Sequence, residues 1–418
     1  MFLLRRSIRG SVVETPDGVG MLIITTLWTA FFVVNFNIAM MIPLLPFIER
    51  DIGLSSAQAG MVLAAFPIAA LISNLTLGPL IDRYGRKRFI VAGATACAVI
   101  FALTAAGRGA VPIALGRAAT GVFMPMIGAS VFAAIADYYP PGARGRVAGI
   151  VTSAAPLAFL FSMSLGVLLG GLLAWQVPLL IMAVIALALA TAATRLPPTQ
   201  ADALSRAPIS VGLYRQRLLS FSLDQATRLL LSSYFCWAAA IFVFLGLYPS
   251  WVVQHGLASH GVGAIGTMLV LGEIGGLLGA LLSGPLSRRF RHPLSLCALA
   301  AGAAAMTVLI VPFGDGSLVF QAVAYGIFAF GRDLMLALML GGAMLLVSAA
   351  QRGSLNAMLN AIYQTGATLG GLASAWLYGF RADFMANAIV AWGLFAASAF
   401  MLWSITRIRV PAMTASGT

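Results

Sequence analysis

The sequence has 418 residues, of which 61% are hydrophobic and only 9% are charged. A soluble globular protein carries about a quarter charged residues, so a soluble fold is excluded and a lipid bilayer is the expected surrounding. The net charge is +13, yet the positive residues lie in short loops between apolar stretches. This placement is typical of charges that orient a membrane protein, and no nucleic-acid partner is expected.

In chain order, twelve stretches are apolar over the roughly 20 residues that a transmembrane helix needs. They cover residues 20–46, 57–81, 89–107, 109–135, 147–174, 176–195, 229–253, 262–287, 293–313, 317–348, 354–380 and 384–405. The first stretch is longer than the ~7–15-residue core of a cleaved signal peptide, so it is predicted to remain as an anchor. Only Ala174, Trp175 and Gln176 separate the fifth stretch from the sixth.

The basic residues predict the orientation of the chain. If the N-terminus is cytoplasmic, 20 of the 25 Lys and Arg residues fall in cytoplasmic segments and three on the opposite side, while Arg117 and Arg332 lie inside spans. Because cytoplasmic loops are enriched in Lys and Arg, both termini are predicted to be cytoplasmic.

A polar stretch divides the chain into two sets of six spans. It covers residues 196–228, contains three prolines, and is predicted to be a cytoplasmic linker. The linker would join an N-terminal six-helix bundle, residues 1–195, to a C-terminal six-helix bundle, residues 229–418. Part of it, around 213–219, could instead lie on the membrane surface as a short amphipathic helix.

Two strings repeat at equivalent places in the two halves. GPLIDRYGRKR at 78–88 aligns with GPLSRRFRH at 284–292, and the glycines within 166–171 align with those within 366–371. A parallel repeat of this kind is typical of secondary transporters, whose substrate site lies between the halves. The glycines alone could also reflect close helix packing, which small residues permit in lipid.

The string at 78–88 closely resembles the signature loop of the major facilitator superfamily, and the chain is similar to that family, in particular its 12-span drug:proton antiporter branch, over essentially its whole length. The resemblance implies an all-α membrane fold of twelve helices in two halves, working by alternating access. It also implies a cytoplasmic conformational latch formed by Gly78, Asp82, Arg83, Gly85, Arg86 and Asp137. In that latch Asp82 would dock at the start of the eleventh span, near Gly353 and Ser354, and Arg86 would pair with Asp137. Alternatively, these charges only fix the topology.

Other stretches carry the same resemblance. Arg117 and Gly121 match the family's R-x-x-x-G pattern, in which the arginine faces the central cavity and takes part in proton handling. The export pattern G-x-x-x-G-P-x-x-G-G is only partly present, because Ser162 and Val167 replace its first glycine and its proline. The stretch at 41–60 resembles the end of the first span in drug:proton exporters.

Three charged residues fall near the middle of C-terminal spans: Glu273, Arg332 and Asp333. A charge at membrane depth costs about 2.5–3.5 kcal/mol on insertion scales, and it indicates function. We expect Arg332 to reach Glu273 or the substrate, while Asp333 points about 100° away. Exchange of Arg332 between Glu273 and another anion would couple proton binding to conformation, so Glu273 is the predicted proton carrier and Asp333 the second candidate. Alternatively, a permanent ion pair joins the eighth and tenth spans.

Polar residues inside the spans are candidates for substrate contacts. They are Asn35, Asn37, Tyr234, Asn356, Asn360, Tyr363 and Gln364. In the eleventh span Asn356, Asn360 and Gln364 recur every four residues and share one helix face. That face could instead clamp neighbouring helices together by hydrogen bonds.

No cofactor is expected, because an ATP-driven pump needs a P-loop and the only lysine, Lys87, does not lie in one. The three cysteines and three histidines lack metal-ligand spacing, so neither a metal nor an enzyme activity is expected. The sequence therefore predicts a monomeric, multi-pass transporter of a bacterial inner membrane that exports small organic molecules in exchange for protons. The alternatives are a proton-coupled symporter that imports a small metabolite, such as an anionic one, and a non-transporting membrane receptor.

Overall fold

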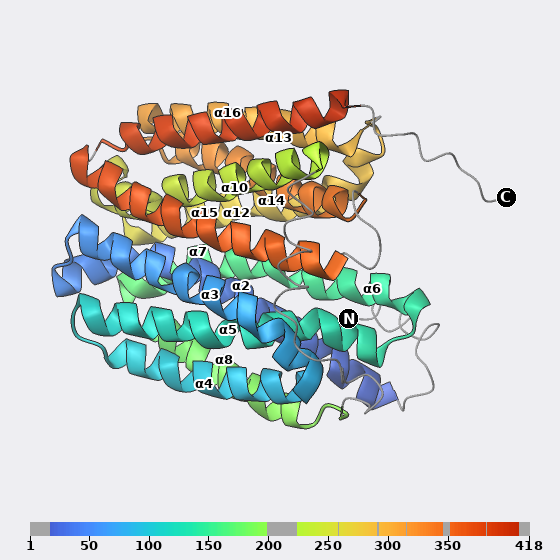
Figure 1. The fold of residues 1–418 in the computed structure, drawn as a ribbon. Helices are drawn as coiled ribbons and strands as arrows, with labels where there is room; N and C mark the ends of the chain where they lie inside the picture. Colours follow the sequence, from blue (N-terminus) through green and yellow to red (C-terminus); the bar gives the residue numbers. More distant parts are fainter. Residues whose placement is uncertain are drawn as a thin grey trace. The chain divides into compact units, whose positions relative to one another are not determined.

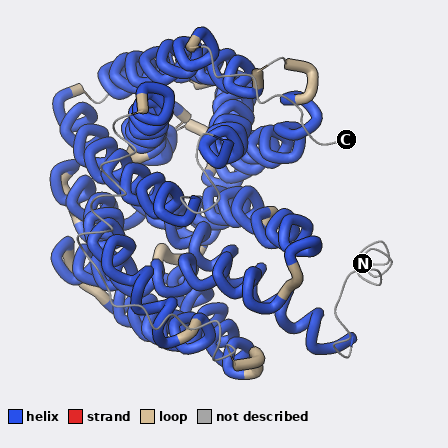
Figure 2. The backbone as a smooth tube through the Cα atoms, turned by 45° about the vertical axis from the view of Figure 1, so that its right-hand side comes forward, coloured by secondary structure: helices blue, strands red, loops and turns tan. Residues whose placement is uncertain are grey.

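The computed structural model describes residues 17–198, 224–257, 259–290, 292–314, 316–345, 352–381 and 383–408. Within these ranges every regular element is a helix and no strand occurs (Figure 2), which confirms the predicted all-α class. The chain divides into two compact units. Unit 1 comprises Met1–Ile209 and Leu247–Val270, and unit 2 comprises Ser210–Gly246 and Leu271–Thr418.

Most helices of unit 1 are coloured blue to green in Figure 1. They are α2 (Asp17–Ile52), α3 (Ser56–Tyr84), α4 (Arg86–Ala106), α5 (Ala110–Tyr138), α6 (Pro141–Thr152), α7 (Ala154–Leu172) and α8 (Gln176–Thr194), followed later in the chain by the short α11 (Tyr248–Trp251) and the π-helical turn η2 (Val252–Gly256).

The helices of unit 2 are coloured yellow-green to red in Figure 1. They are α10 (Gln225–Leu245), α12 (Val262–Ser287), α13 (Pro293–Ile310), the 3-10 turn η3 (Val311–Gly314), α14 (Leu318–Leu345), α15 (Arg352–Phe380) and α16 (Met385–Arg407). Helix α12 begins in unit 1 and continues in unit 2.

The predicted twelve-helix membrane fold is confirmed. Eleven helices in the described part of the chain are long and apolar enough to cross a membrane. The remaining predicted span, 354–380, is α15, a helix of 29 residues that includes the polar residues Asn360 and Gln364. The break predicted near Trp175 separates α7 from α8.

Two predicted spans differ from the structure in their continuity. The fifth span is two helices that meet at Ser153. Pro156 explains this break, because proline has no N–H to bond the carbonyl of Thr152. The seventh span is interrupted at Gly246, where an added Cβ would lie 2.9 Å from Ser374 Oγ on α15. Glycine therefore permits the close approach of α10 and α15 at this point.

The two units repeat one packing pattern. In unit 1, α2 packs on α7, α4 on α8, and α5 on α4; in unit 2, α10 packs on α15, α13 on α16, and α14 on α13. The aligned glycines occupy equivalent places, since Gly166 packs against Pro43 of α2 and Gly366 packs against Ala238 of α10. The parallel repeat predicted from the sequence therefore corresponds to matching helix neighbours, and its glycines serve close packing.

The segment Leu247–Val270 groups with unit 1, although the predicted C-terminal bundle, 229–418, includes it. Gln254 of this segment donates a hydrogen bond to Glu49 of α2, with Nε2 3.1 Å from Oε2. Residues 199–223, which make up most of the predicted linker and its amphipathic alternative, lie outside the described part. The predicted bundle and linker boundaries stay a prediction.

Asp224 caps the first turn of α10. Its Oδ2 accepts hydrogen bonds from the Thr227 backbone N at 2.8 Å and from Thr227 Oγ1 at 2.6 Å. These hydrogen bonds hold the pKa of the Asp224 carboxyl below its ordinary value. Asp224→Ala is expected to lower the free energy of unfolding by about 0.5–2 kcal/mol, measured by thermal unfolding in detergent at pH 7.

Asp224→Asn is the matched control, because asparagine caps helices as well as aspartate does. A lowered pKa in the folded state stabilises the protein above the ordinary pKa of the carboxyl, and this contribution is lost as the pH falls through the folded-state pKa. The difference between wild type and Asp224→Ala should therefore shrink below about pH 4. An unchanged difference at pH 3 would contradict the capping account.

Candidate functional site

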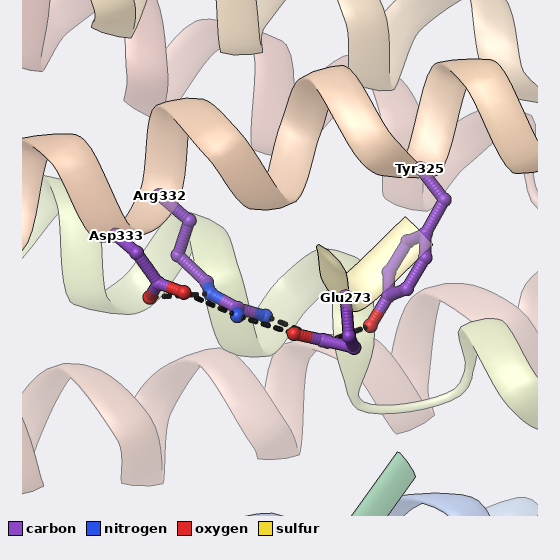
Figure 3. A network of polar contacts seen from close by, with 4 residues as sticks. All are labelled: Glu273, Tyr325, Arg332 and Asp333. Carbon is purple, nitrogen blue, oxygen red and sulfur yellow. Dashed lines mark hydrogen bonds and ion pairs between the residues drawn. The ribbon is translucent and has the colours of Figure 1, made fainter. Parts of the chain in front are cut away.

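Three charged side chains meet in unit 2, between α12 and α14 (Figure 3). Arg332 of α14 donates two hydrogen bonds to Glu273 of α12. Nη2 lies 2.7 Å from Oε2, and Nη1 lies 3.1 Å from Oε1. Both side chains are almost fully buried, with 2% and 1% of their surface exposed. Two-pronged contact between a guanidinium and a carboxylate is the strongest common form of ion pair, so this contact joins the two helices. The predicted approach of Arg332 to Glu273 is confirmed.

Arg332 also binds its own sequence neighbour. Its Nε lies 3.0 Å from Asp333 Oδ1, and its Nη2 lies 2.9 Å from Asp333 Oδ2. We expected Arg332 and Asp333 to point about 100° apart. This expectation is wrong for the ends of the two side chains, because the long arginine side chain bends back toward Asp333. One guanidinium thus serves two carboxylates, and the group carries one formal negative charge in excess when all three residues are ionised.

Tyr325 completes this group, which we call the charge cluster (Glu273, Tyr325, Arg332 and Asp333). Its hydroxyl donates a hydrogen bond to Glu273 Oε1 (Figure 3). Tyr325 was not among the residues predicted for the site, so its hydrogen bond to Glu273 was missed. A signal was present in the sequence, because Tyr325 precedes Arg332 by seven residues and therefore lies on the same face of α14 two turns earlier.

Glycines on α12 make room for the charge cluster. A Cβ on Gly276 would meet Asp333 Oδ2 and would lie 3.0 Å from Arg332 Nη2. A Cβ on Gly275 would meet the backbone carbonyl of Gly326 on α14. The two backbones can approach this closely only because these positions lack side chains, and this proximity brings Glu273 within reach of Arg332.

Aromatic residues of α10 and α15 form a second group in unit 2. The rings of Tyr234 and Trp237 stack with centroids 5.1 Å apart, and Tyr363 of α15 lies 6.0 Å from Trp237. The buried Trp237 Nε1 has no hydrogen-bond partner among the described residues, so this group offers stacking surfaces and a hydrogen-bond donor.

The other predicted substrate residues differ in their hydrogen-bond partners and in their exposure. Asn35 Nδ2 bonds the carbonyl of Phe31 in its own helix at 2.8 Å. Asn360 is exposed, whereas Gln364 is buried and its Oε1 finds no hydrogen-bond partner in the described ranges. The Asn356 side chain lies outside the described part. Of the predicted set, the structure thus brings Tyr234 and Tyr363 together, while Asn360 and Gln364 differ in exposure.

Asn37 instead meets Arg117 in unit 1. Arg117 Nη1 donates to Asn37 Oδ1 at 3.0 Å and to the Asn37 backbone carbonyl at 3.2 Å. The guanidinium carbon lies 4.8 Å from the centroid of the Phe66 ring, a cation–π contact that the sequence did not indicate. Arg117 and Asn37 are both buried, at 3% and 0% exposure.

The predicted latch is described in part. Arg86 Nε lies 3.3 Å from Asp137 Oδ2, so the predicted pairing of these residues is present. Gly85 alone joins α3 to α4, and its φ of 90° is a conformation that favours glycine. The Arg83 side chain is exposed. The surroundings of Gly78 and of the Asp82 side chain, and those of the predicted docking point at Gly353 and Ser354, lie outside the described residues.

Comparisons with known proteins are consistent with this fold. The family model for the Major Facilitator Superfamily matches residues 27–340. The crystal structure of the nucleoside transporter NupG superposes with a TM-score of 0.74, covering 92% of this chain and 99% of that one at 16% sequence identity. At this identity the likeness shows the fold alone.

Three curated relatives come from Bacillus subtilis. The MFS-type transporter YceJ is 26% identical over 84% of this chain and 88% of its own length. The Hexuronate transporter is 25% identical over 57% of this chain and 58% of its own length. Multidrug resistance protein 1 is 29% identical over 34% of this chain and 37% of its own length. The chain therefore matches most of the first relative but only part of the other two.

Proposed function

Because the chain belongs to the Major Facilitator Superfamily, a family of membrane transporters, we propose that it exports small organic molecules in exchange for protons. The observation that carries the proposal is the charge cluster, in which one arginine serves two carboxylates at membrane depth. Charges at this depth are costly and are kept where transport or coupling needs them. The partial match to Multidrug resistance protein 1 supports the export of organic compounds.

The cluster supplies the chemistry that proton exchange requires. Arg332 can neutralise one carboxylate fully, so the second carboxylate needs a proton or a cationic group of the substrate to avoid a buried net charge. When Arg332 moves toward Asp333, Glu273 loses its counter-ion and binds a proton; when Arg332 returns, the proton leaves. Glu273 is our first choice of carrier because it is the more buried carboxylate, with Asp333 the second.

The substrate would lie beside this cluster. Tyr234, Trp237 and Tyr363 offer stacking surfaces, and Gln364 offers an acceptor that no described residue pairs with. Aromatic side chains give large contact areas with little loss of side-chain entropy, which suits small organic molecules of varied shape. The Arg86–Asp137 pair would act as a latch that holds one conformation of unit 1. We expect a monomer in a bacterial inner membrane, with both termini cytoplasmic.

A second candidate function is import of an organic acid together with protons. The partial match to the Hexuronate transporter and the buried Arg117 favour it. Both candidates use the charge cluster for coupling, and they differ in the direction of the substrate relative to the proton.

Proton flux in liposomes tests the proposal. Purified protein is reconstituted with a pH-sensitive dye inside, a proton gradient is imposed, and amphiphilic drugs and small organic acids are added in turn. Wild type is expected to show substrate-induced proton flux opposite in direction to the substrate, and Glu273→Gln is expected to lose it. Flux in the same direction as the substrate would favour the symporter.

Asp333→Asn and Glu49→Gln serve as comparison variants in this assay. Flux that is lost in Asp333→Asn and kept in Glu273→Gln would move the carrier to Asp333. Glu49 lies near the end of α2 in unit 1, is no member of the charge cluster, and loses the same negative charge when it is replaced by glutamine. A loss of flux in Glu49→Gln as large as in Glu273→Gln would argue against a specific role for the cluster.

A further inference from the structure

Arg117 is a buried positive charge in unit 1 without an acidic counterpart in its helices. The acidic residues of α2 to α8 all lie close to helix ends: Asp17, Glu49, Asp51, Asp82 and Asp137. At 1.5 Å per residue, Glu49 is about 18 Å along α2 from the Asn37 that Arg117 contacts, and Asp137 is about 30 Å along α5 from Arg117. None of these carboxylates can reach the guanidinium while the helices are straight.

Arg117 and Asn37 together have more buried hydrogen-bond donors than the acceptors around them can pair with. Arg117 Nη1 is bonded to the two oxygens of Asn37. Arg117 Nε and Asn37 Nδ2 are both buried, and neither has a hydrogen-bond partner within the part of the chain that the structure describes. Both atoms are donors only. A buried donor without a hydrogen bond destabilises the structure, and the effect is larger for a charged group.

We propose that Arg117 and Asn37 form a binding site for the carboxylate of a small organic acid. A carboxylate supplies only acceptors, can take hydrogen bonds from Nε and Nδ2 together, and neutralises the guanidinium. A neutral acceptor would satisfy the two donors but would leave the positive charge of the guanidinium unbalanced. A cation would be repelled by that charge. The ring of Phe66 packs against the guanidinium group of Arg117 and holds its orientation.

This site rests on the proposed transport of small organic molecules and narrows their class. Both side chains are buried in this structure, so a ligand reaches them only after a conformational change. Alternating access supplies such a change. The site lies within unit 1 and uses none of the residues of the charge cluster, so its failure and the failure of proton coupling can be told apart.

Binding of matched anionic and neutral probes to the purified full chain tests the site. Benzoate is compared with benzamide, and glucuronate with glucose, by titration calorimetry and by the ligand-dependent shift in unfolding temperature. Wild type is expected to bind the two anions at least tenfold more tightly than their neutral counterparts. Arg117→Gln is expected to lose at least tenfold in affinity for the anions, whereas Arg50→Gln, the same change at an exposed end of α2, should lose none.

Asn37→Asp keeps the test decisive if Arg117→Gln does not fold. It preserves the size of the side chain and places a carboxylate against the guanidinium, so it should abolish anion binding without lowering the unfolding temperature. Equal binding of anionic and neutral probes, no binding of either anion, or anion binding that survives Asn37→Asp would overturn the proposal. Proton flux measured on the same preparations reports separately on coupling. If the wild-type protein shows flux but does not bind the anions, the carboxylate site is refuted and proton coupling is not.

Discussion

Arg332→Gln is expected to cost about 3–5 kcal/mol in the free energy of unfolding and to abolish substrate-dependent proton flux. The change removes the only partner shared by Glu273 and Asp333 in the charge cluster. Two carboxylates would then lie buried at membrane depth without a counter-ion, and breaking a buried pair on one side costs about this much. Denaturant unfolding in detergent measures the first effect, and flux in liposomes measures the second.

Arg381→Gln is the control for this prediction. Arg381 also pairs with a neighbouring aspartate in unit 2, with Nη2 2.6 Å from Asp383 Oδ2, but the two side chains are 58% and 48% exposed. Exposed pairs contribute about 0–1 kcal/mol, so this variant should unfold close to wild type. Similar losses in Arg332→Gln and Arg381→Gln would contradict the burial argument.

Gly275→Ala is expected to separate α12 from α14 and to lower the free energy of unfolding by about 1–3 kcal/mol. The added methyl group would meet the backbone carbonyl of Gly326, which cannot turn aside as a side chain can. The shift would lengthen the contact between Arg332 and Glu273, so proton flux should fall together with stability. The unfolding temperature and the flux assay measure the two effects.

Two other glycines give the comparison. Gly302, in the middle of α13, has open space around its Cβ position, so Gly302→Ala should be neutral or should stabilise the protein by up to about 1 kcal/mol. Gly276→Ala meets side-chain ends of the charge cluster, so it should reduce flux at a smaller cost in stability than Gly275→Ala. Equal stability of the variants at Gly275 and Gly302 would show that α12 and α14 are not tightly packed.

The membrane fold and its repeat were predictable from the sequence. Hydropathy is summed over about 20 residues, so it locates spans well even where a single boundary is unclear, as at Trp175. The same averaging conceals the break at Ser153, because one proline barely changes the sum.

The candidate site was predictable in its residue types more than in its contacts. Glu273 and Arg332 stand out because charges are rare at membrane depth. Their pairing with Asp333 depends on how the arginine side chain bends, which helical periodicity does not specify. The contact between Arg117 and Asn37 depends on the register of α5 against α2, and register is set by packing that the sequence pattern does not reveal.

Proton release on substrate binding tests the central claim, that Glu273 exchanges a proton for substrate, most directly. Detergent-solubilised protein is mixed, in weakly buffered solution with a pH indicator, with the compound that drives the largest flux in liposomes. Wild type is expected to release protons on binding, and Glu273→Gln is expected to bind the compound without releasing any. Equal release from both proteins, or no release from wild type, would contradict the account.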